Sequence, residues 1–216
     1  GGGRSAVLIG PGHPRSGSII ANDKKWRRGE PLHRIHRPVF AANSFNACAG
    51  SASRFAPLYD AAGTCVPTMY VGNNFTCALH ESIFHDVPLT GTKSVRNSLL
   101  DEFVYSILVP QQDLRLADLS TSGLMKIGAP RALTECEPSG YHETVEWARA
   151  LHRDNPGLGG LLWVARRDNE GRAMVLFGDR LAAGTLAVQH GPIPLRYFET
   201  EIDTIAAHCD IDIVRR

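Results

Sequence analysis

The chain has 216 residues, of which 43% are hydrophobic and 21% are charged, so it can bury a packed core and is not disordered in bulk. Its 23 Lys and Arg residues against 22 Asp and Glu give a formal net charge of +1. This balance excludes the broad positive surface of a typical nucleic-acid or membrane-surface binder, and no direct nucleic-acid binding is expected. The apolar runs are short or interrupted by Pro, Gly and Asn, so we expect a cytoplasmic protein without a membrane segment.

The five cysteines are an odd number and are widely spaced, and no two of them form a C-x-x-C pair. Such spacing disfavours both a disulfide framework and a cysteine zinc site. The interpretation is that all of them are reduced thiols: Cys48, Cys65, Cys77, Cys136 and Cys209.

Residues 1–31 are rich in Gly, Pro, Ser and basic residues and show no helical or strand period, which predicts a loosely ordered basic arm. Residues 32–216 are expected to form a single domain that begins with a strand at Leu32–His36. Residues 37–66 mix small polar residues with Pro and Gly. They predict a long loop region, and a loop of this length in a compact domain usually binds something.

The next predicted elements are a short strand at Thr68–Val71 and a helix from Phe75 to the residues before Pro88, capped by Asn74. Further elements follow in chain order: strands at Phe103–Val109 and near Leu114, a helix at Tyr141–Arg153, a hairpin of Leu161–Ala165 with Ala173–Phe177 about a turn at 168–171, a helix at Phe198–Cys209 and a strand at Ile211–Ile213. Because no regular βαβ repeat appears, an α+β fold is favoured over a doubly wound sheet.

Several common catalytic signatures are missing from the sequence. There is no phosphate-binding P-loop, no dinucleotide-binding G-x-G-x-x-G, no H-E-x-x-H zinc motif and no G-x-S-x-G nucleophile elbow. The pair His80-Glu81 is followed by a histidine five residues after His80, a spacing that does not place both rings on one metal.

Four polar residues stand in apolar or small surroundings: Arg34, Arg54, Tyr70 and Glu81. On a helix with 100° per residue, Glu81 falls roughly 130° from the centre of the apolar stripe and faces a cleft or water, with His85 on the same face. Each residue also has an ordinary explanation, such as a solvated carboxylate, a surface ion pair or a strand aromatic. Periodicity alone therefore names no function.

The order and amino-acid sequences of several segments are more specific than periodicity. They run Leu-His-Arg-Ile, Ser-Arg-Phe-Ala-Pro, Pro-Thr-Met-Tyr-Val-Gly, Cys-Ala-Leu-His-Glu-Ser-Ile-Phe-His-Asp-Val-Pro, and later Gly-Leu-Leu-Trp-Val-Ala-Arg with Met-Val-Leu-Phe. This series resembles the RES domain family over residues 32–180. The resemblance implies an ADP-ribosyltransferase-like mixed β-sheet core flanked by helices. It also implies a toxin of a toxin–antitoxin pair that degrades NAD⁺ by cleaving the nicotinamide–ribose bond, by hydrolysis or phosphorolysis, and that binds a cognate antitoxin.

The resemblance assigns roles that suit each side chain. Glu81, with Arg34 and Tyr70, would be catalytic, because cleavage builds positive charge on the ribose that a carboxylate can stabilise. Arg34 and Arg54 would hold the pyrophosphate of NAD⁺, and Tyr70 would stack on nicotinamide. NAD⁺ would be the substrate, and no metal would be needed.

The serine of the family pattern has two candidate positions in this chain. Ser139 is the candidate for NAD⁺ binding, with a plain helix cap as its alternative interpretation, and the resemblance places the family serine also at the position where this chain has Ala165. Two alternatives therefore remain: an ADP-ribosyltransferase that modifies a protein from the same NAD⁺ site, and a catalytically impaired binding module. Trp26, Trp147 and Trp163 are candidates for an exposed interface, which leaves a homo-oligomer open. The role of residues 181–216 is also open.

Overall fold

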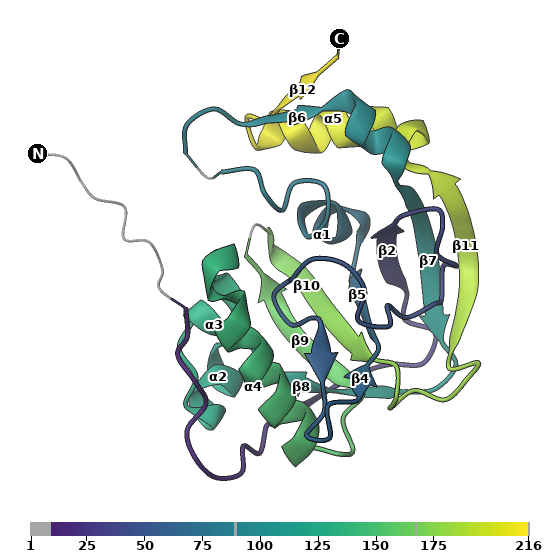
Figure 1. The fold of residues 1–216 in the computed structure, drawn as a ribbon. Coiled ribbons are helices and arrows are strands. Elements are labelled where there is room, and N and C mark those ends of the chain that lie inside the picture. The colour runs from purple at the N-terminus through teal and green to yellow at the C-terminus, as the bar shows by residue number, and fades with distance from the viewer. Residues whose placement is uncertain (1–9, 89, 167, 216) are drawn as a thin grey trace, which may run out of the picture.

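The computed structural model describes residues 10–88, 90–166 and 168–215 (Figure 1). The strands are β1 Asp23–Trp26, β2 Leu32–His36, β3 Leu58–Tyr59, β4 Cys65–Val66, β5 Thr68–Gly72, β6 Ser94–Arg96, β7 Val104–Pro110, β8 Leu114–Asp118, β9 Gly160–Ala165, β10 Asp168–Phe177, β11 Leu186–Pro194 and β12 Asp212–Val214. The helices are α1 Phe75–His80, α2 Thr121–Ile127, α3 Ala132–Glu135, α4 Tyr141–Asp154 and α5 Glu199–His208, with short 3₁₀ helices η1 Asn97–Glu102, η2 Pro138–Gly140 and η3 Leu195–Phe198.

Eight strands form one curled mixed sheet in the order β1-β8-β9-β10-β5-β2-β7-β11. All neighbours are antiparallel except β8 and β9, which run parallel. Helices α3 and α4 lie beside β8 and β9, whereas α5 lies with β6 and β12 at the opposite end of the molecule (Figure 1). The predicted α+β class with helices around a mixed sheet is confirmed.

Both faces of the central strands are buried, and the alternation of side chains shows how. Along β9, Leu161 and Trp163 belong to a core cluster that includes residues of α4, whereas Leu162 belongs to a second cluster on the other face. β10 repeats the pattern with Val175 in the first cluster and Met174 in the second. Because successive strand residues point to opposite faces, this near-continuous apolar run requires cover on both sides.

The segment before Leu32 packs on the domain. β1 pairs with β8 along Asp23–Trp26, and the side chains of Ile19 and Trp26 are buried. The backbone N–H of Ile19 donates to Asp154 at the end of α4, at 2.8 Å. The prediction of a loosely ordered arm is therefore wrong for residues 10–31. Asp23 to Lys25 are charged and exposed, as in a solvated arm, but they belong to an edge strand in which Trp26 is the buried apolar residue. Residues 1–9 lie outside the described residues.

Most other predicted elements are present, with two differences. α1 ends at His80, and Glu81 is its C-cap. After it the helical pattern is lost, because the backbone N–H groups of Ile83 and Phe84 both donate to the carbonyl oxygen of Leu79. The residues predicted as the hairpin turn form the irregular start of β10, where Asp168 already pairs with Ala165.

The prediction of exposed tryptophans is wrong, since Trp26, Trp147 and Trp163 are all buried. Within the described ranges, no helix combines the length and the apolar character that crossing a bilayer requires.

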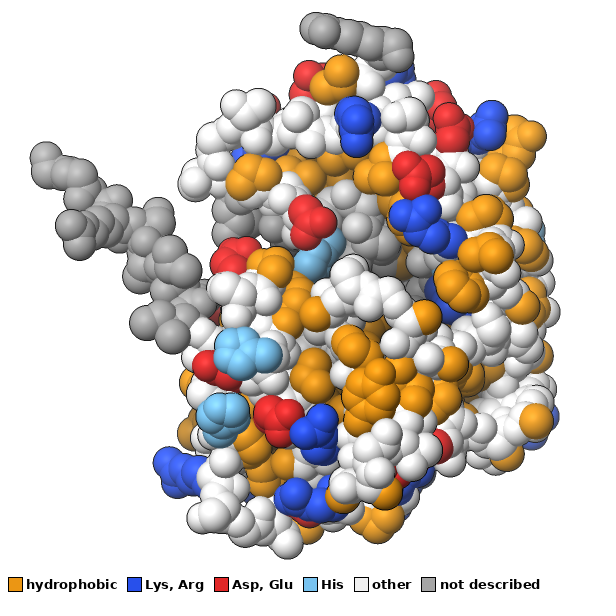
Figure 2. All heavy atoms as spheres, viewed as in Figure 1, with side chains coloured by type: hydrophobic (Ala, Val, Ile, Leu, Met, Phe, Trp, Pro, Cys, Tyr) orange, Lys and Arg blue, Asp and Glu red, His pale blue; other side chains and the backbone are white. Residues whose placement is uncertain are grey.

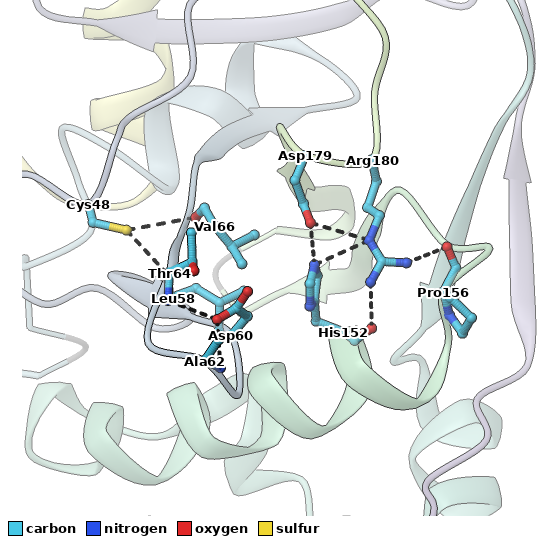
Figure 3. A network of polar contacts seen from close by, with 10 residues as sticks. All are labelled: Cys48, Leu58, Asp60, Ala62, Thr64, Val66, His152, Pro156, Asp179 and Arg180. Carbon is cyan, nitrogen blue, oxygen red and sulfur yellow. Dashed lines mark hydrogen bonds and ion pairs between the residues drawn. The ribbon is translucent and has the colours of Figure 1, made fainter.

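Cys48 and Cys65 form a disulfide with their Cα atoms 6.0 Å apart, so the prediction of five reduced thiols is wrong for this pair. Cys65 lies on β4 and Cys48 lies in the loop before β3; the turn of the β3–β4 hairpin is closed by Asp60 Oδ1, which accepts the N–H groups of Ala62 and Thr64 (Figure 3). Cys48 Sγ lies 3.2 Å from the carbonyl oxygen of Leu58, but as a disulfide sulfur it has no proton to donate. Cys77, Cys136 and Cys209 are free.

Reduction of this disulfide should destabilise the fold, because the bond closes a loop over a sequence separation of 17. For a loop of this size we expect the free energy of unfolding to fall by about 3 kcal/mol. Urea unfolding with and without reductant, and of the Cys48→Ser/Cys65→Ser double variant, measures it. Cys209→Ser is the matched control. Equal urea midpoints for the oxidised and reduced protein would contradict the expectation.

Candidate active site

A cavity of about 480 Å³ opens where strands β2 and β5 separate. The two strands share one paired position, His33 with Gly72, and beyond it the walls of the cavity come from Ile35 and His36 on one side and from Thr68 to Tyr70 on the other. Residues of the loop that includes Cys48 and Ser53 form a further wall. Figure 2 shows a hollowed face with Lys and Arg side chains near one rim and His and acidic side chains near the other.

Arg34 lines this cavity from β2 and has only 7% of its surface exposed. Its Nη1 atom donates to the carbonyl oxygens of Ala42 at 2.5 Å and Ser44 at 2.8 Å, so the guanidinium group holds the loop that follows β2. Within the described ranges no carboxylate forms an ion pair with it, and burial lowers the pKa of Arg34 to about 10. A buried cation compensated only by carbonyl dipoles is a place where an anionic ligand gains free energy.

Tyr70 lies on β5 at the edge of the same cavity and fastens the neighbouring loop. Its hydroxyl accepts the N–H of Phe55 at 2.8 Å and lies 3.1 Å from Ser53 Oγ. Its ring meets Trp163 edge-on, with centroids 6.3 Å apart. Burial raises the pKa of Tyr70 to about 12, so the phenol is neutral at physiological pH. The hydroxyl therefore holds the residues on both sides of Arg54.

Arg54 is 5% exposed and extends away from the cavity wall toward the start of α4. Its Nη1 atom donates to the carbonyl oxygen of Cys136 at 3.2 Å, and its guanidinium carbon lies 5.4 Å from the ring centre of Tyr141. The hydroxyl of Thr144 donates to the backbone carbonyl of Arg54. No carboxylate of the described part of the chain forms an ion pair with this arginine, which makes it the second buried guanidinium of the site without one.

Glu81 is placed by the tight junction of β5 and α1. A Cβ atom on Gly72 would lie 2.9 Å from the backbone nitrogen of Ala78, so only glycine lets the helix approach the strand this closely. Asn74 caps the helix by accepting the N–H of Cys77 at 2.7 Å. Glu81 follows one short helix later and is half-buried. The prediction that His85 shares its helix face is wrong, because the helix has already ended.

Three of the four predicted residues interact electrostatically with Tyr141, a residue that sequence patterns did not single out. Burial raises the pKa of Tyr141 to about 12; the charge of Arg54 opposes the rise, and that of Glu81 adds to it. Arg54 also acts on the pKa of Tyr70. Arg54, Tyr70 and Glu81 thus lie within electrostatic range of one centre. Arg34 and Tyr70 line the cavity, whereas Arg54, Glu81 and Tyr141 are not among its lining residues.

The two serine positions lie apart from the cavity. Ser139 is exposed in η2, and the N-cap of α4 is Gly140 without a side-chain bond, so the interpretation of Ser139 as a helix cap is wrong. Ala165 is 1% exposed at the end of β9, in the core cluster that contains Trp163. Neither residue lines the cavity between β2 and β5.

Two further residues belong to this region, Tyr141 and His85. The Tyr141 hydroxyl lies 2.8 Å from His85 Nε2, and His85 Nδ1 lies 2.9 Å from a carboxylate oxygen of Asp86. Sequence patterns mark Tyr141 only as the first residue of a helix, since its contacts come from segments far away in the chain. Elsewhere, among residues 10–88, 90–166 and 168–215, no three His, Cys, Asp or Glu side chains are grouped so that they could hold a metal ion.

A model of the RES domain matches residues 31–196, which is most of the chain, and the chain therefore belongs to the RES domain family. The family is associated with toxin–antitoxin systems and with enzymes that act on NAD⁺. A search of curated proteins found no significant match. The matched range includes every residue of the site described above.

The buried tyrosines should make the fold sensitive to alkaline pH. The pKa values of Tyr70, Tyr105 and Tyr141 are each raised from 10.0 to about 12, chiefly by burial. The folded state keeps these protons where the unfolded chain loses them, so their contribution to stability is complete below pH 10 and is lost as the pH rises toward 12. Urea unfolding between pH 9 and 11.5 should show this fall, and Tyr105→Phe should make it shallower. A constant free energy of unfolding over that range would contradict the expectation.

Proposed function

We propose that this chain is an NAD⁺-consuming enzyme that cleaves the bond between nicotinamide and ribose. The observation that carries the proposal is the pair of buried guanidinium groups, Arg34 and Arg54, neither of which forms an ion pair with a described carboxylate. Arg34 shares the cavity wall with Tyr70, whose hydroxyl holds the residues on both sides of Arg54, and Glu81 is within electrostatic range of Tyr141, which contacts Arg54. Two positive groups, an aromatic phenol and one carboxylate match a diphosphate, a pyridine ring and a ribose.

The chemistry follows from these roles. When the bond breaks, nicotinamide leaves with the bonding electron pair and positive charge develops on the ribose. Glu81 would stabilise that charge, and water, phosphate or a protein side chain would form the new bond at the same carbon and release a proton. Tyr70, neutral at physiological pH, offers a ring to stack on and a hydroxyl that already orders the loop of Arg54. A cavity of about 480 Å³ is within the ordinary range for small-molecule sites.

Release of nicotinamide from NAD⁺ by the purified protein tests the proposal directly. Release in buffer alone supports hydrolysis, release that requires inorganic phosphate supports phosphorolysis, and transfer of label to proteins of a cell extract supports an ADP-ribosyltransferase. No release under any of these conditions would instead support an impaired binding module, the alternative that Ala165 in place of a serine raises.

Glu81→Gln should lower the rate of nicotinamide release by at least about 100-fold, because a neutral amide cannot stabilise the charge on the ribose. Glu201→Gln is the matched control, since Glu201 is exposed on α5. Initial rates at saturating NAD⁺ measure the effect. Full turnover by Glu81→Gln would remove the catalytic assignment.

Arg54→Gln should weaken the binding of ADP-ribose by about 10-fold or more and leave the much weaker binding of adenosine unchanged, because the lost interaction is with the diphosphate. Isothermal titration with the two probes measures the difference. Exposed Arg27→Gln is the control. If both probes lose affinity equally, Arg54 acts on the shape of the site and does not bind phosphate.

We further propose that a cognate antitoxin covers this cleft and that both proteins act in the cytoplasm. The association of the family with toxin–antitoxin systems supports this. Co-expression with the neighbouring gene should yield a complex in which nicotinamide release is suppressed. Purification of the chain alone from that co-expression would count against the partner.

A further inference from the structure

Tyr141, the first residue of α4, contacts two segments that carry the site. Its ring lies under the guanidinium group of Arg54, with 5.4 Å between the guanidinium carbon and the ring centre. Its hydroxyl lies 2.8 Å from His85 Nε2, in the turn that follows Glu81. Only 4% of Tyr141 is exposed, so its side chain is buried, whereas its partner His85 is partly exposed.

The direction of the bond to His85 follows from its other partner. A carboxylate oxygen of Asp86 can only accept a hydrogen bond, so His85 Nδ1, at 2.9 Å, carries a proton. In the neutral ring Nε2 is then the acceptor of the hydrogen bond that the Tyr141 hydroxyl donates. Asp86 thus favours the tautomer in which His85 accepts a hydrogen bond from the Tyr141 hydroxyl.

The ring acts on Arg54 separately from the backbone contacts. Thr144, one turn further along α4, donates its hydroxyl to the carbonyl of Arg54, and Tyr70 holds the N–H of Phe55. The main chain at Arg54 is therefore fixed without Tyr141. The ring of Tyr141 adds an aromatic surface against which the guanidinium group of Arg54 packs. The carbonyl oxygen of Cys136 accepts a hydrogen bond from the same group.

The hydroxyl acts on the other segment. Ile83, Phe84 and Val87 anchor this turn in the core cluster beside α5, at the end of the molecule away from α4. The bond from His85 to Tyr141 links the same turn to α4. The turn that begins at Glu81, four residues before His85, is thereby held between two parts of the domain.

We propose that Tyr141 is a positioning residue with two separable effects: its ring orients Arg54 toward the diphosphate, and its hydroxyl, through His85, sets the position of Glu81. This inference rests on the proposed function and assigns Tyr141 no contact with the reacting atoms.

Two substitutions separate the effects. Tyr141→Phe keeps the ring and removes the bond to His85, so we expect kcat for nicotinamide release to fall about 10-fold while KM for NAD⁺ stays within about twofold of the wild-type value. Tyr141→Leu removes both contacts and should also raise KM about 10-fold. His85→Ala should reproduce the kcat loss of Tyr141→Phe. Tyr197→Phe is the control, since Tyr197 is 73% exposed in η3.

Thermal unfolding and the stoichiometry of ADP-ribose binding give the folded, binding-competent fraction of each variant, and a merely structural role would lower kcat only in proportion to that fraction. Equal kinetic constants for Tyr141→Phe and wild type would overturn the inference and leave the proposed function intact. Identical KM values for Tyr141→Phe and Tyr141→Leu would overturn the role of the ring. A wild-type protein that neither binds nor cleaves NAD⁺ would overturn the proposed function, and this inference with it.

Discussion

Burying a guanidinium group without a carboxylate beside it is costly, and the site is organised around two such groups. Arg34 is compensated by the carbonyl oxygens of the loop after β2, and Arg54 by a carbonyl, a sulfur atom and the face of Tyr141. Carbonyls and aromatic faces can stabilise a cation without neutralising it. Arg34 lines the cavity, so its positive charge stays available to an anion that enters there.

The same contacts explain why long loops can form an accurate site. The segment between β2 and β5 has little regular structure, but Arg34 fastens its beginning, the Cys48–Cys65 disulfide joins its middle to its end, and the Tyr70 hydroxyl fastens the residues around Arg54. The two hydrogen-bonding side chains belong to strands β2 and β5, and the disulfide joins the loop to β4. A loop tied at three points loses much of its conformational entropy on folding and not on binding the ligand.

The region around the start of α4 gives the site its second half. Here the turn after α1 and the loop of Arg54 meet, although they are separated from α4 by more than fifty residues of sequence. Tyr141 contacts both through one side chain, with a polar end for His85 and an apolar face for Arg54. This combination is characteristic of tyrosine, which can pack as an apolar residue and still satisfy a hydrogen bond.

The amino-acid sequence by itself was enough for the strands with strong apolar character, the α4 helix, the β9–β10 hairpin and the wording that marks the RES domain, because these signals are local in the chain. It was misleading where local composition and tertiary packing disagree: Asp23 to Lys25 look like a solvated arm but form an edge strand, and Cys48 and Cys65 look unpaired although the fold of the long loop brings Cys48 to β4. Long-range packing sets the separation of β2 and β5 that opens a cavity, the end of α1 before Glu81, and the place of Tyr141 between Arg54 and His85. These features depend on contacts between residues distant in sequence, and neither periodicity nor spacing encodes which distant residues will meet.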